Sequence, residues 1–173
     1  GGFGTPVGTS IGPYANSFDI GDVDGDDIPD VVTGSGSEPG LVDGVISVGI
    51  GDGAGSFSFT SDSPVCATNN GFNSDVGSLS LVDLDNDGDQ DLAFTCEANR
   101  TLSTAINDGN GLFSAQAHLM TNYHNHNLAV GDFNLDGATD LVSASNSGLD
   151  LLLNIPTGNR VGLRSPASDF SSL

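Results

Sequence analysis

Apolar and polar residues alternate in short segments along the 173-residue chain, and these segments recur in the same order three times. The first segment of each set contains Phe18 and Ile20, Leu79 and Leu81, or Leu128 and Val130. The second contains 31–32, 92–94 or 141–142, and the third is 45–48, 102–106 or 149–153. A period of two predicts β-strands, and no apolar stripe with helical spacing has a useful length. The sequence therefore predicts an all-β fold.

A glycine-rich turn follows the third segment of the first two sets, at residues 51–56 and 107–112. Glycine reaches the positive φ that a hairpin turn requires, and the phenylalanine after each turn, Phe57 or Phe113, anchors a returning fourth strand. Phe57 follows Phe3 by 54 residues, and Phe113 follows Phe57 by 56. A unit of about 50 residues with four short strands is typical of a β-propeller blade.

This periodicity divides the chain into a terminal strand of a preceding blade, three repeats and a polar tail. The predicted bounds are 1–10 for the strand, 11–60, 61–117 and 118–164 for the repeats, and 165–173 for the tail. The predicted fold is thus a tandem of four-stranded antiparallel blades of β-propeller type. Three blades are too few to close a propeller, which has about four to eight.

Two explanations for the incomplete propeller stay open. The chain is an excerpt of a longer propeller, or it is a complete subunit whose residues 1–10 complete a blade of a neighbouring copy. The second arrangement is head-to-tail and gives a ring or a filament. Deletion of residues 1–10 would then abolish assembly.

An aspartate-rich loop of nine residues separates the first and second strands of every set. Positions 1, 3, 5 and 9 carry side-chain oxygens, and position 7 offers a backbone carbonyl. The residues are Asp22, Asp24, Asp26, Ile28 and Asp30; Asp83, Asp85, Asp87, Asp89 and Asp91; and Asp132, Asn134, Asp136, Ala138 and Asp140. Ca²⁺ takes six to eight oxygen ligands at roughly 2.3–2.6 Å. The three loops therefore predict about three bound Ca²⁺ ions per chain.

The loops differ from an EF-hand and from one another. An EF-hand places a bidentate Glu at position 12, where this chain has Thr33, Phe94 and Ser143. Position 6 is Asp27 in the first loop instead of glycine, which predicts either strain or a shifted turn. Asn134 removes one carboxylate from the third loop. We therefore rank calcium affinity as second loop, then first, then third.

The charge balance argues against two classes of partner. The formal net charge is −20, from 23 acidic residues against three arginines, and 13 of the acids fall in the three loops (five, five and three). Three arginines among 23 acidic residues provide no basic surface to contact phosphate, so we expect no nucleic acid and no anionic membrane as a partner. No apolar run reaches 18 residues, so no membrane insertion is expected.

The only two cysteines, Cys66 and Cys96, suit one disulfide formed in an oxidising compartment. Two buried free thiols are the alternative. Asn99-Arg-Thr101 is the single N-glycosylation sequon. The cysteine pair and the acidic composition predict an extracellular or cell-surface protein.

The loop motif and its flanks resemble the FG-GAP/VCBS repeats. The resemblance is carried by Asp-x-Asp-x-Asp-Gly-x-x-Asp-Leu, by the apolar-Gly-Asp strand before it and by Gly-x-Gly-x-Phe after it, and it extends from Gly1 to about Asn154. Such repeats form blades of integrin-α-like and bacterial extracellular propellers. The resemblance implies Ca²⁺ binding at the blade rim by the side chains at positions 1, 3, 5 and 9.

A binding or structural role is favoured over catalysis. Tyr123-His124-Asn-His126 could place two imidazoles on one strand face, with His118 nearby, as a zinc or copper site needs. The alternative is a variable polar rim. The aspartates are explained by calcium ligation and therefore do not predict a glycosidase pair.

We accordingly interpret the chain as an extracellular, non-catalytic calcium-binding module with a structural or adhesive role. Its expected partners are further blades or copies of itself, and a surface carbohydrate is a second class of partner. The alternative function is a self-assembling subunit of a filament or ring. The propeller part of a carbohydrate-active enzyme comes third.

Overall fold

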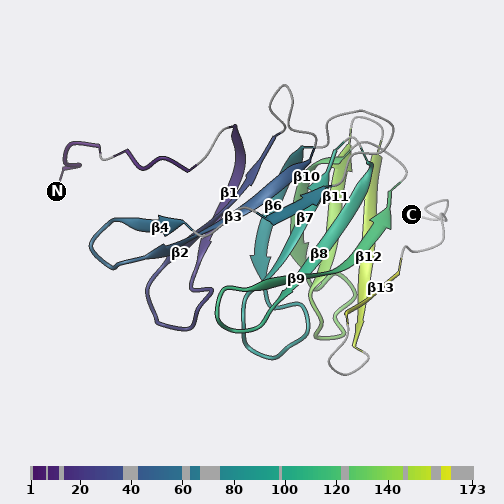
Figure 1. The fold of residues 1–173 in the computed structure, drawn as a ribbon. Helices are drawn as coiled ribbons and strands as arrows, with labels where there is room; N and C mark the ends of the chain where they lie inside the picture. Colours follow the sequence, from purple (N-terminus) through teal and green to yellow (C-terminus); the bar gives the residue numbers. More distant parts are fainter. Residues whose placement is uncertain are drawn as a thin grey trace.

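The computed structural model is built from three antiparallel sheets stacked side by side (Figure 1). It describes residues 2–6, 8–11, 14–36, 43–59, 63–66, 75–97, 99–121, 125–145, 148–156 and 161–164. Within those ranges the regular structure is strand throughout, with no helix. The predicted all-β class is confirmed.

Each sheet is formed by strands that are consecutive in the sequence. The first sheet contains β1 (Ala15–Gly21), β2 (Asp30–Ser35), β3 (Gly44–Gly51), β4 (Phe57–Phe59) and β5 (Ser63–Cys66). The second contains β6 (Val76–Val82), β7 (Asp91–Cys96), β8 (Thr101–Asn107) and β9 (Phe113–Met120). The third contains β10 (Asn125–Gly131), β11 (Asp140–Ser145), β12 (Gly148–Pro156) and β13 (Val161–Arg164).

The predicted fourth strand is present in all three sheets, but in the first it is divided. β4 pairs with Gly49–Gly51 of β3, whereas β5 pairs with Gly44–Ile46 of the same strand. In the second sheet β9 follows β8 along its whole length, with one register shift between Thr104 and Ala105. The glycines of the preceding turns have the expected positive φ, for example Gly53 at 68° and Gly109 at 77°.

The sheets stack through their first strands, because β6 contacts both β1 and β10. A separate hydrophobic cluster fills each of the two interfaces between neighbouring sheets, which we call the seams. Strand β7 contributes to both: Leu92 and Phe94 face the first sheet, while Ala93 faces the third. All three are completely buried. Burial on two faces explains why 92–94 is a continuous apolar run rather than an alternating one, and a fully buried Phe94 contributes about 1.5–3 kcal/mol.

Equivalent positions are buried in the seams and exposed at the two outer faces of the stack. Leu79 and Leu81 of β6 are 7% and 8% exposed, but their counterparts in β1, Phe18 and Ile20, are 68% and 56% exposed. Asp19 between them reaches β6, where its Oδ2 accepts a hydrogen bond from the Leu81 N–H at 2.9 Å. Strand alternation therefore turns Phe18 and Ile20 away from the second sheet.

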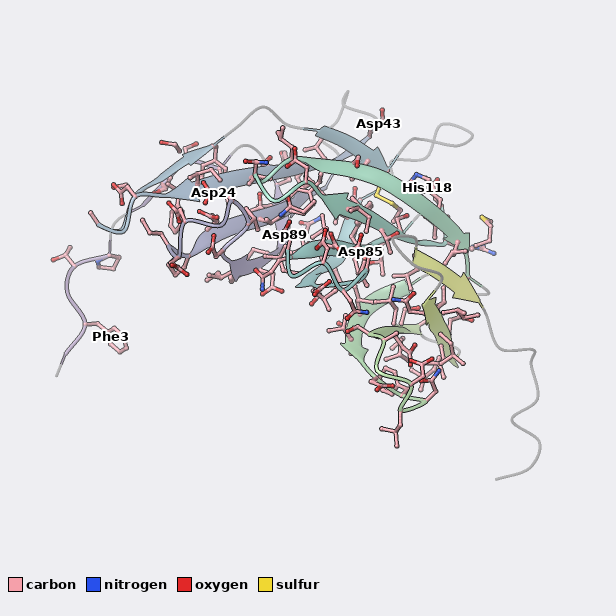
Figure 2. The ribbon with its side chains drawn as sticks, turned by 90° about the horizontal axis from the view of Figure 1, so that it is seen from below. Phe3, Asp24, Asp43, Asp85, Asp89 and His118 are labelled. Carbon is pink, nitrogen blue, oxygen red and sulfur yellow. A yellow bond between two sulfur atoms is a disulfide. The ribbon has the colours of Figure 1, made fainter. Side chains whose placement is uncertain are left out.

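The segment predicted to complete a blade elsewhere lies apart from the sheets. Residues 2–6 and 8–11 form no strand, and Phe3 projects from them into solvent (Figure 2). The hypothesis pairs this segment with another chain, so it stays a prediction, as do the predicted segment bounds.

A disulfide joins the first two sheets. Cys66 of β5 and Cys96 of β7 are bonded and are both 1% exposed. The predicted disulfide is therefore present, and the alternative of two free thiols is wrong. The bond lies within the hydrophobic cluster of the first seam.

Candidate metal centres

The three aspartate-rich loops connect the first two strands of each sheet: β1 to β2, β6 to β7 and β10 to β11. Because the sheets stack in register, all three loops project from the same edge of the stack (the lower edge in Figure 1). Glycines of the β8–β9 turn pack against the first loop: a Cβ on Gly111 would lie 3.5 Å from Val23 Cγ2 and 3.9 Å from Asp24 Cβ.

The backbone of each loop is held by the aspartate at position 1. Asp22 Oδ1 accepts hydrogen bonds from the N–H groups of Gly25 (2.8 Å) and Asp26 (3.1 Å), and its Oδ2 accepts one from Asp27 (2.8 Å). The position-6 N–H of Gly88 donates to Asp83 Oδ2 in the second loop, and that of Gly137 donates to Asp132 Oδ2 in the third. Short aspartate side chains favour this kind of local turn.

Positions 4 and 6 have positive φ in every loop. At position 4 the residues are Gly25 (78°), Asn86 (62°) and Leu135 (60°), and at position 6 they are Asp27 (64°), Gly88 (101°) and Gly137 (88°). Asp27 therefore adopts the glycine conformation, so the first loop is strained at this residue and its turn is not shifted.

The aspartate at position 9 is completely buried in each loop and ties the loop to the rest of its sheet. One carboxylate oxygen accepts the N–H of position 2, and the other accepts the N–H of a residue in the third strand of the sheet. The pairs are Val23 and Gly51 on Asp30, Leu84 and Asn107 on Asp91, and Phe133 and Asn154 on Asp140, at 2.8–2.9 Å.

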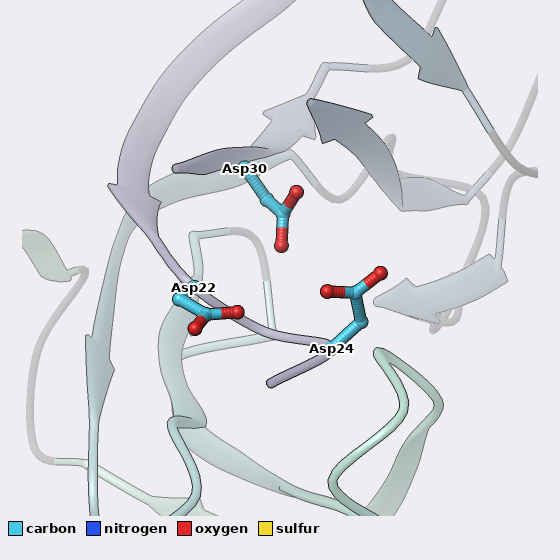
Figure 3. A group of neighbouring side chains, drawn as sticks. All are labelled: Asp22, Asp24 and Asp30. Carbon is cyan, nitrogen blue, oxygen red and sulfur yellow. The ribbon is translucent and has the colours of Figure 1, made fainter. Parts of the chain in front are cut away.

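Three carboxylates converge in the first and second loops. One oxygen from each of Asp22, Asp24 and Asp30 lies within 4.8 Å of the other two, and these side chains face a shared space (Figure 3). Asp83, Asp85 and Asp91 form the same arrangement. Oxygens bound on opposite sides of one Ca²⁺ lie about 4.8 Å apart, so both groups have the spacing of a shared cation.

The electrostatics of both groups favour a bound cation. Burial raises the pKa of Asp91 to about 6 against the lowering effect of its two N–H donors, and the charges of Asp85 and Asp87 raise it further. Burial also raises the pKa of Asp85, as does the neighbouring Asp87. Crowded, desolvated carboxylates raise one another's pKa values unless a positive charge offsets them.

One atom of the first loop tests directly whether the loop residues fit a bound cation. Asp24 Oδ1 is buried and has no hydrogen-bond partner, and burial, followed by Asp26 and Asp30, raises the pKa of this carboxyl. A buried carboxylate oxygen without a donor is costly. A cation held by Asp22, Asp24 and Asp30 would satisfy it, so these residues fit Ca²⁺.

The remaining predicted ligands are arranged differently. At position 5, one oxygen each of Asp26, Asp87 and Asp136 accepts the N–H of position 7, which is Ile28, Asp89 or Ala138. In the third loop the Asn134 amide donates to Asp136 Oδ2 at 2.8 Å. Asn134 thus replaces the middle carboxylate, and the position-7 carbonyl ligands stay predictions.

The predicted histidine site cannot be placed. Tyr123 and His124 lie outside the described residues, as does the side chain of His126. His118 on β9 is exposed, and its Nδ1 lies 2.8 Å from Ser103 Oγ. Asn99 lies before β8 and is partly exposed, so the sequon stays a prediction.

Comparison with family models identifies the repeat in the middle of the chain. A model described as the FG-GAP-like repeat matches residues 83–143. This part of the chain is therefore similar to an FG-GAP-like repeat. The match starts at the second loop, includes the whole third loop and ends within β11, so the predicted resemblance is confirmed there. No curated protein matches the chain.

The first loop lies outside the matched FG-GAP-like range, yet it has the same hydrogen bonds and the same positive φ positions as the loops inside it. The part of the chain that the structure describes contains no helix long and apolar enough to cross a membrane.

Proposed function

We propose that this chain is an extracellular calcium-binding module of the FG-GAP type with a non-catalytic, structural or adhesive role. The observation that carries the proposal is the buried, unpartnered Oδ1 of Asp24 beside Asp22 and Asp30. The matching group of Asp83, Asp85 and Asp91 and the FG-GAP-like repeat at 83–143 support it.

The protein's own residues prepare each loop for the ion. The position-1 aspartate orders the turn, and the position-9 aspartate anchors the loop to the third strand. Bound Ca²⁺ would supply positive charge to carboxylates that otherwise repel by about 1 kcal/mol per pair at 4 Å even in bulk water. Calcium binding is then linked to folding, because the unfolded chain does not hold the carboxylates together.

The disulfide supports the extracellular setting. Cys66–Cys96 is buried between two sheets, and such bonds persist in oxidising compartments. Loops that require Ca²⁺ also suit such a setting, where extracellular modules bind it with dissociation constants of about 10⁻⁴–10⁻³ M.

Thermal unfolding with and without calcium tests the proposal. We expect the melting temperature in millimolar Ca²⁺ to exceed that in EDTA by many degrees, with equimolar Mg²⁺ giving a smaller gain because it prefers an octahedral, partly hydrated shell. Elemental analysis should find calcium near three per chain and no zinc or copper. An identical melt in EDTA and calcium would refute the calcium role, and stoichiometric zinc would favour the His-x-His site.

Head-to-tail self-association is a second candidate function, and the outer faces of the stack favour it. The positions that fill the internal seams are exposed at the ends: Phe18 and Ile20 on one face, and Phe133, at 51%, on the other. Its counterparts Val23 and Leu84 are each 1% exposed. Two copies could therefore meet through the contacts that join neighbouring sheets, which is a heterologous interface.

Light scattering in millimolar calcium tests this candidate. We expect the mass to rise with concentration, and we expect Phe18→Ser with Ile20→Ser to keep the chain monomeric without lowering its melting temperature. Deletion of residues 1–10 distinguishes strand exchange from face-to-face contact, because only strand exchange requires that segment. A chain that stays monomeric at every concentration would leave the calcium module without this activity.

A further inference from the structure

Asn107, at the end of β8, lies where two of the loops meet. Its side chain is 3% exposed. Nδ2 donates to the Val23 carbonyl at 2.8 Å and to the Gln90 carbonyl at 3.2 Å. Val23 is position 2 of the first loop and Gln90 is position 8 of the second, so one amide group contacts both loops.

The orientation of this amide is fixed by its partners. Oδ1 accepts the N–H groups of Gly109 (3.2 Å) and Gly111 (3.1 Å), and Nδ2 faces two carbonyls. Exchanging the two ends would place oxygen against carbonyls and N–H against N–H. The Asn107 backbone N–H also donates to Asp91 Oδ1 at 2.9 Å.

Asn154 of β12 repeats the arrangement at the second seam. It is 2% exposed, its Nδ2 donates to the Leu84 carbonyl at 2.7 Å, and its backbone N–H donates to Asp140 Oδ1 at 2.8 Å. Leu84 is position 2 of the second loop. We call Asn107 and Asn154 the seam asparagines.

Each seam asparagine therefore connects two consecutive loops. Its backbone holds the position-9 aspartate of its own sheet, and its side chain holds the peptide between positions 1 and 3 of the preceding loop. That peptide separates Asp22 from Asp24 in the first loop and Asp83 from Asp85 in the second. The connections run from the first loop through Asn107 to the second, and through Asn154 to the third.

The first sheet provides a contrast. Its equivalent residue is Gly51, whose N–H donates to Asp30 Oδ1 at 2.8 Å. It has no side chain to extend further, and a Cβ there would lie 2.3 Å from the Pro29 carbonyl oxygen. The backbone contact is thus common to all three sheets, whereas the amide occurs only where a preceding loop lies beside it.

We propose that the seam asparagines are positioning residues that couple neighbouring loops, so that Ca²⁺ bound in one loop raises the calcium affinity of the neighbouring loop. This inference rests on the proposed calcium binding. An ion that orders the position-9 aspartate also orders the asparagine bonded to it, and the amide then fixes the ligand-bearing peptide of the preceding loop. Such coupling between sites is reciprocal.

A calcium titration monitored by the amide resonances of Gly25, Gly88 and Gly137 in ¹H–¹⁵N NMR spectra resolves the loops individually. Each of these N–H groups donates to the position-1 aspartate of its own loop. Asn154→Leu changes a residue of the third sheet. We nevertheless expect the calcium-dependent change of the Gly88 resonance in the second loop (the Gly88 transition) to require on the order of tenfold more calcium. The Gly25 transition should move far less.

Asn107→Asp keeps the oxygen that accepts from Gly109 and Gly111 but removes the donor to the first loop. Although it adds a negative charge, we expect the Gly25 and Gly88 transitions to require on the order of tenfold more calcium. The matched control is Asn110→Asp on the same turn. Asn110 is exposed and bonds only within the turn, so this variant adds the same charge without breaking a connection between loops.

A double-mutant cycle tests the coupling itself. Asp136→Ala should disable the third loop and thereby weaken the Gly88 transition in the otherwise unchanged chain, but not in Asn154→Leu, where the connection is already lost. Asn154→Asp serves in the same cycle if Asn154→Leu gives a poorly dispersed spectrum.

The possible results distinguish the calcium role of the loops from the coupling between them. If none of the glycine resonances responds to calcium, both the calcium role and the coupling are wrong. If they respond but Asn107→Asp matches Asn110→Asp, or Asp136→Ala leaves Gly88 unchanged, the coupling is wrong and the calcium role stands. If the glycine transition of the neighbouring loop moves as described, the seam asparagines are the connection between the loops.

Discussion

Aspartates of one loop differ in what holds them. Asp91 has both oxygens on backbone N–H groups in a fully buried position, so it supports the framework of the sheet in addition to facing the cation site. Asp85 at position 3 is bonded less: its Oδ1 accepts only a long contact of 3.3 Å from Asp87 N–H. The loop thus combines a structural carboxylate with one whose main task is the cation.

Substitution of these two aspartates should separate the roles. Asp91→Ala leaves two buried N–H groups without acceptors, at about 1–3 kcal/mol each, so it should lower the free energy of unfolding in EDTA as well as in calcium. Asp85→Ala should remove calcium binding by the second loop and leave the unfolding free energy in EDTA equal or higher. Urea unfolding in both buffers measures this. Equal losses in EDTA would contradict the distinction.

The pKa of Asp91 gives the metal-free protein a definite pH dependence. Burial raises this pKa to about 6, above the ordinary value of about 3.9. The folded state then binds a proton that the unfolded state has released, so stability is greatest below about pH 4 for this group and falls as pH rises through about 6.

Calcium should reverse that trend, because its ligands must be ionised. We expect the gain in melting temperature from Ca²⁺ to be large at pH 7 and to shrink as pH falls through about 6. Melts of metal-stripped protein at pH 5, 6 and 7, with and without calcium, check this. A calcium gain that is constant over this range would argue against ionised Asp91 at the site.

At the scale of elements, β5 and β7 are the strands that the disulfide links. The bond closes a separation of 30 residues between the first and second sheets. Constraint of the unfolded chain by such a closure contributes roughly 3–4 kcal/mol. We expect Cys66→Ser with Cys96→Ser to lower the free energy of unfolding by about that amount, and the reductant-treated parent to match the double variant. A loss below 1 kcal/mol would mean that packing alone holds this seam.

How far an element could be predicted depended on how local its signal is. The strands beside each loop follow from period-two alternation, and the turns follow from glycines that adopt positive φ. Leu135 shows the limit, because a leucine gives no local sign of the positive φ that it adopts in the loop, whereas strain at Asp27 was one of two expected outcomes of its place at a glycine position. Asp27 N–H donates to the position-1 aspartate Asp22, and in the third loop the N–H groups of Asp136 and Gly137, which follow Leu135, donate to Asp132.

The seam asparagines were missed for a different reason. Asn107 bonds a residue 84 positions away, and Asn154 bonds one 70 positions away, so no local pattern reveals the contact. The available signal was the alignment of three repeats, which places asparagine at the end of the third strand in two of them and Gly51 in the other. Recognising its meaning required knowing which sheets are neighbours.

At the scale of the whole molecule, 13 of the 23 acidic residues lie in the three loops along one edge of the stack. Without calcium, repulsion along that edge opposes folding. Raising sodium chloride from 0.1 M to 1 M shortens the Debye length from about 10 Å to about 3 Å. We therefore expect the melting temperature in EDTA to rise with salt, and to rise less in calcium. A salt response that is the same in both buffers would place the repulsion outside the loops.

Residue 51 is glycine where the other two sheets have an asparagine, and this difference gives the stack a direction. The first sheet cannot donate an amide to anything placed before it, since a Cβ at Gly51 would collide with the Pro29 carbonyl. The third sheet presents the position-2 residue Phe133 on its outer face, at the position that accepts a seam asparagine in the other loops. A designed array should therefore grow in one direction: a second copy of residues 61–117, which carry Asn107, belongs after the third repeat rather than before the first.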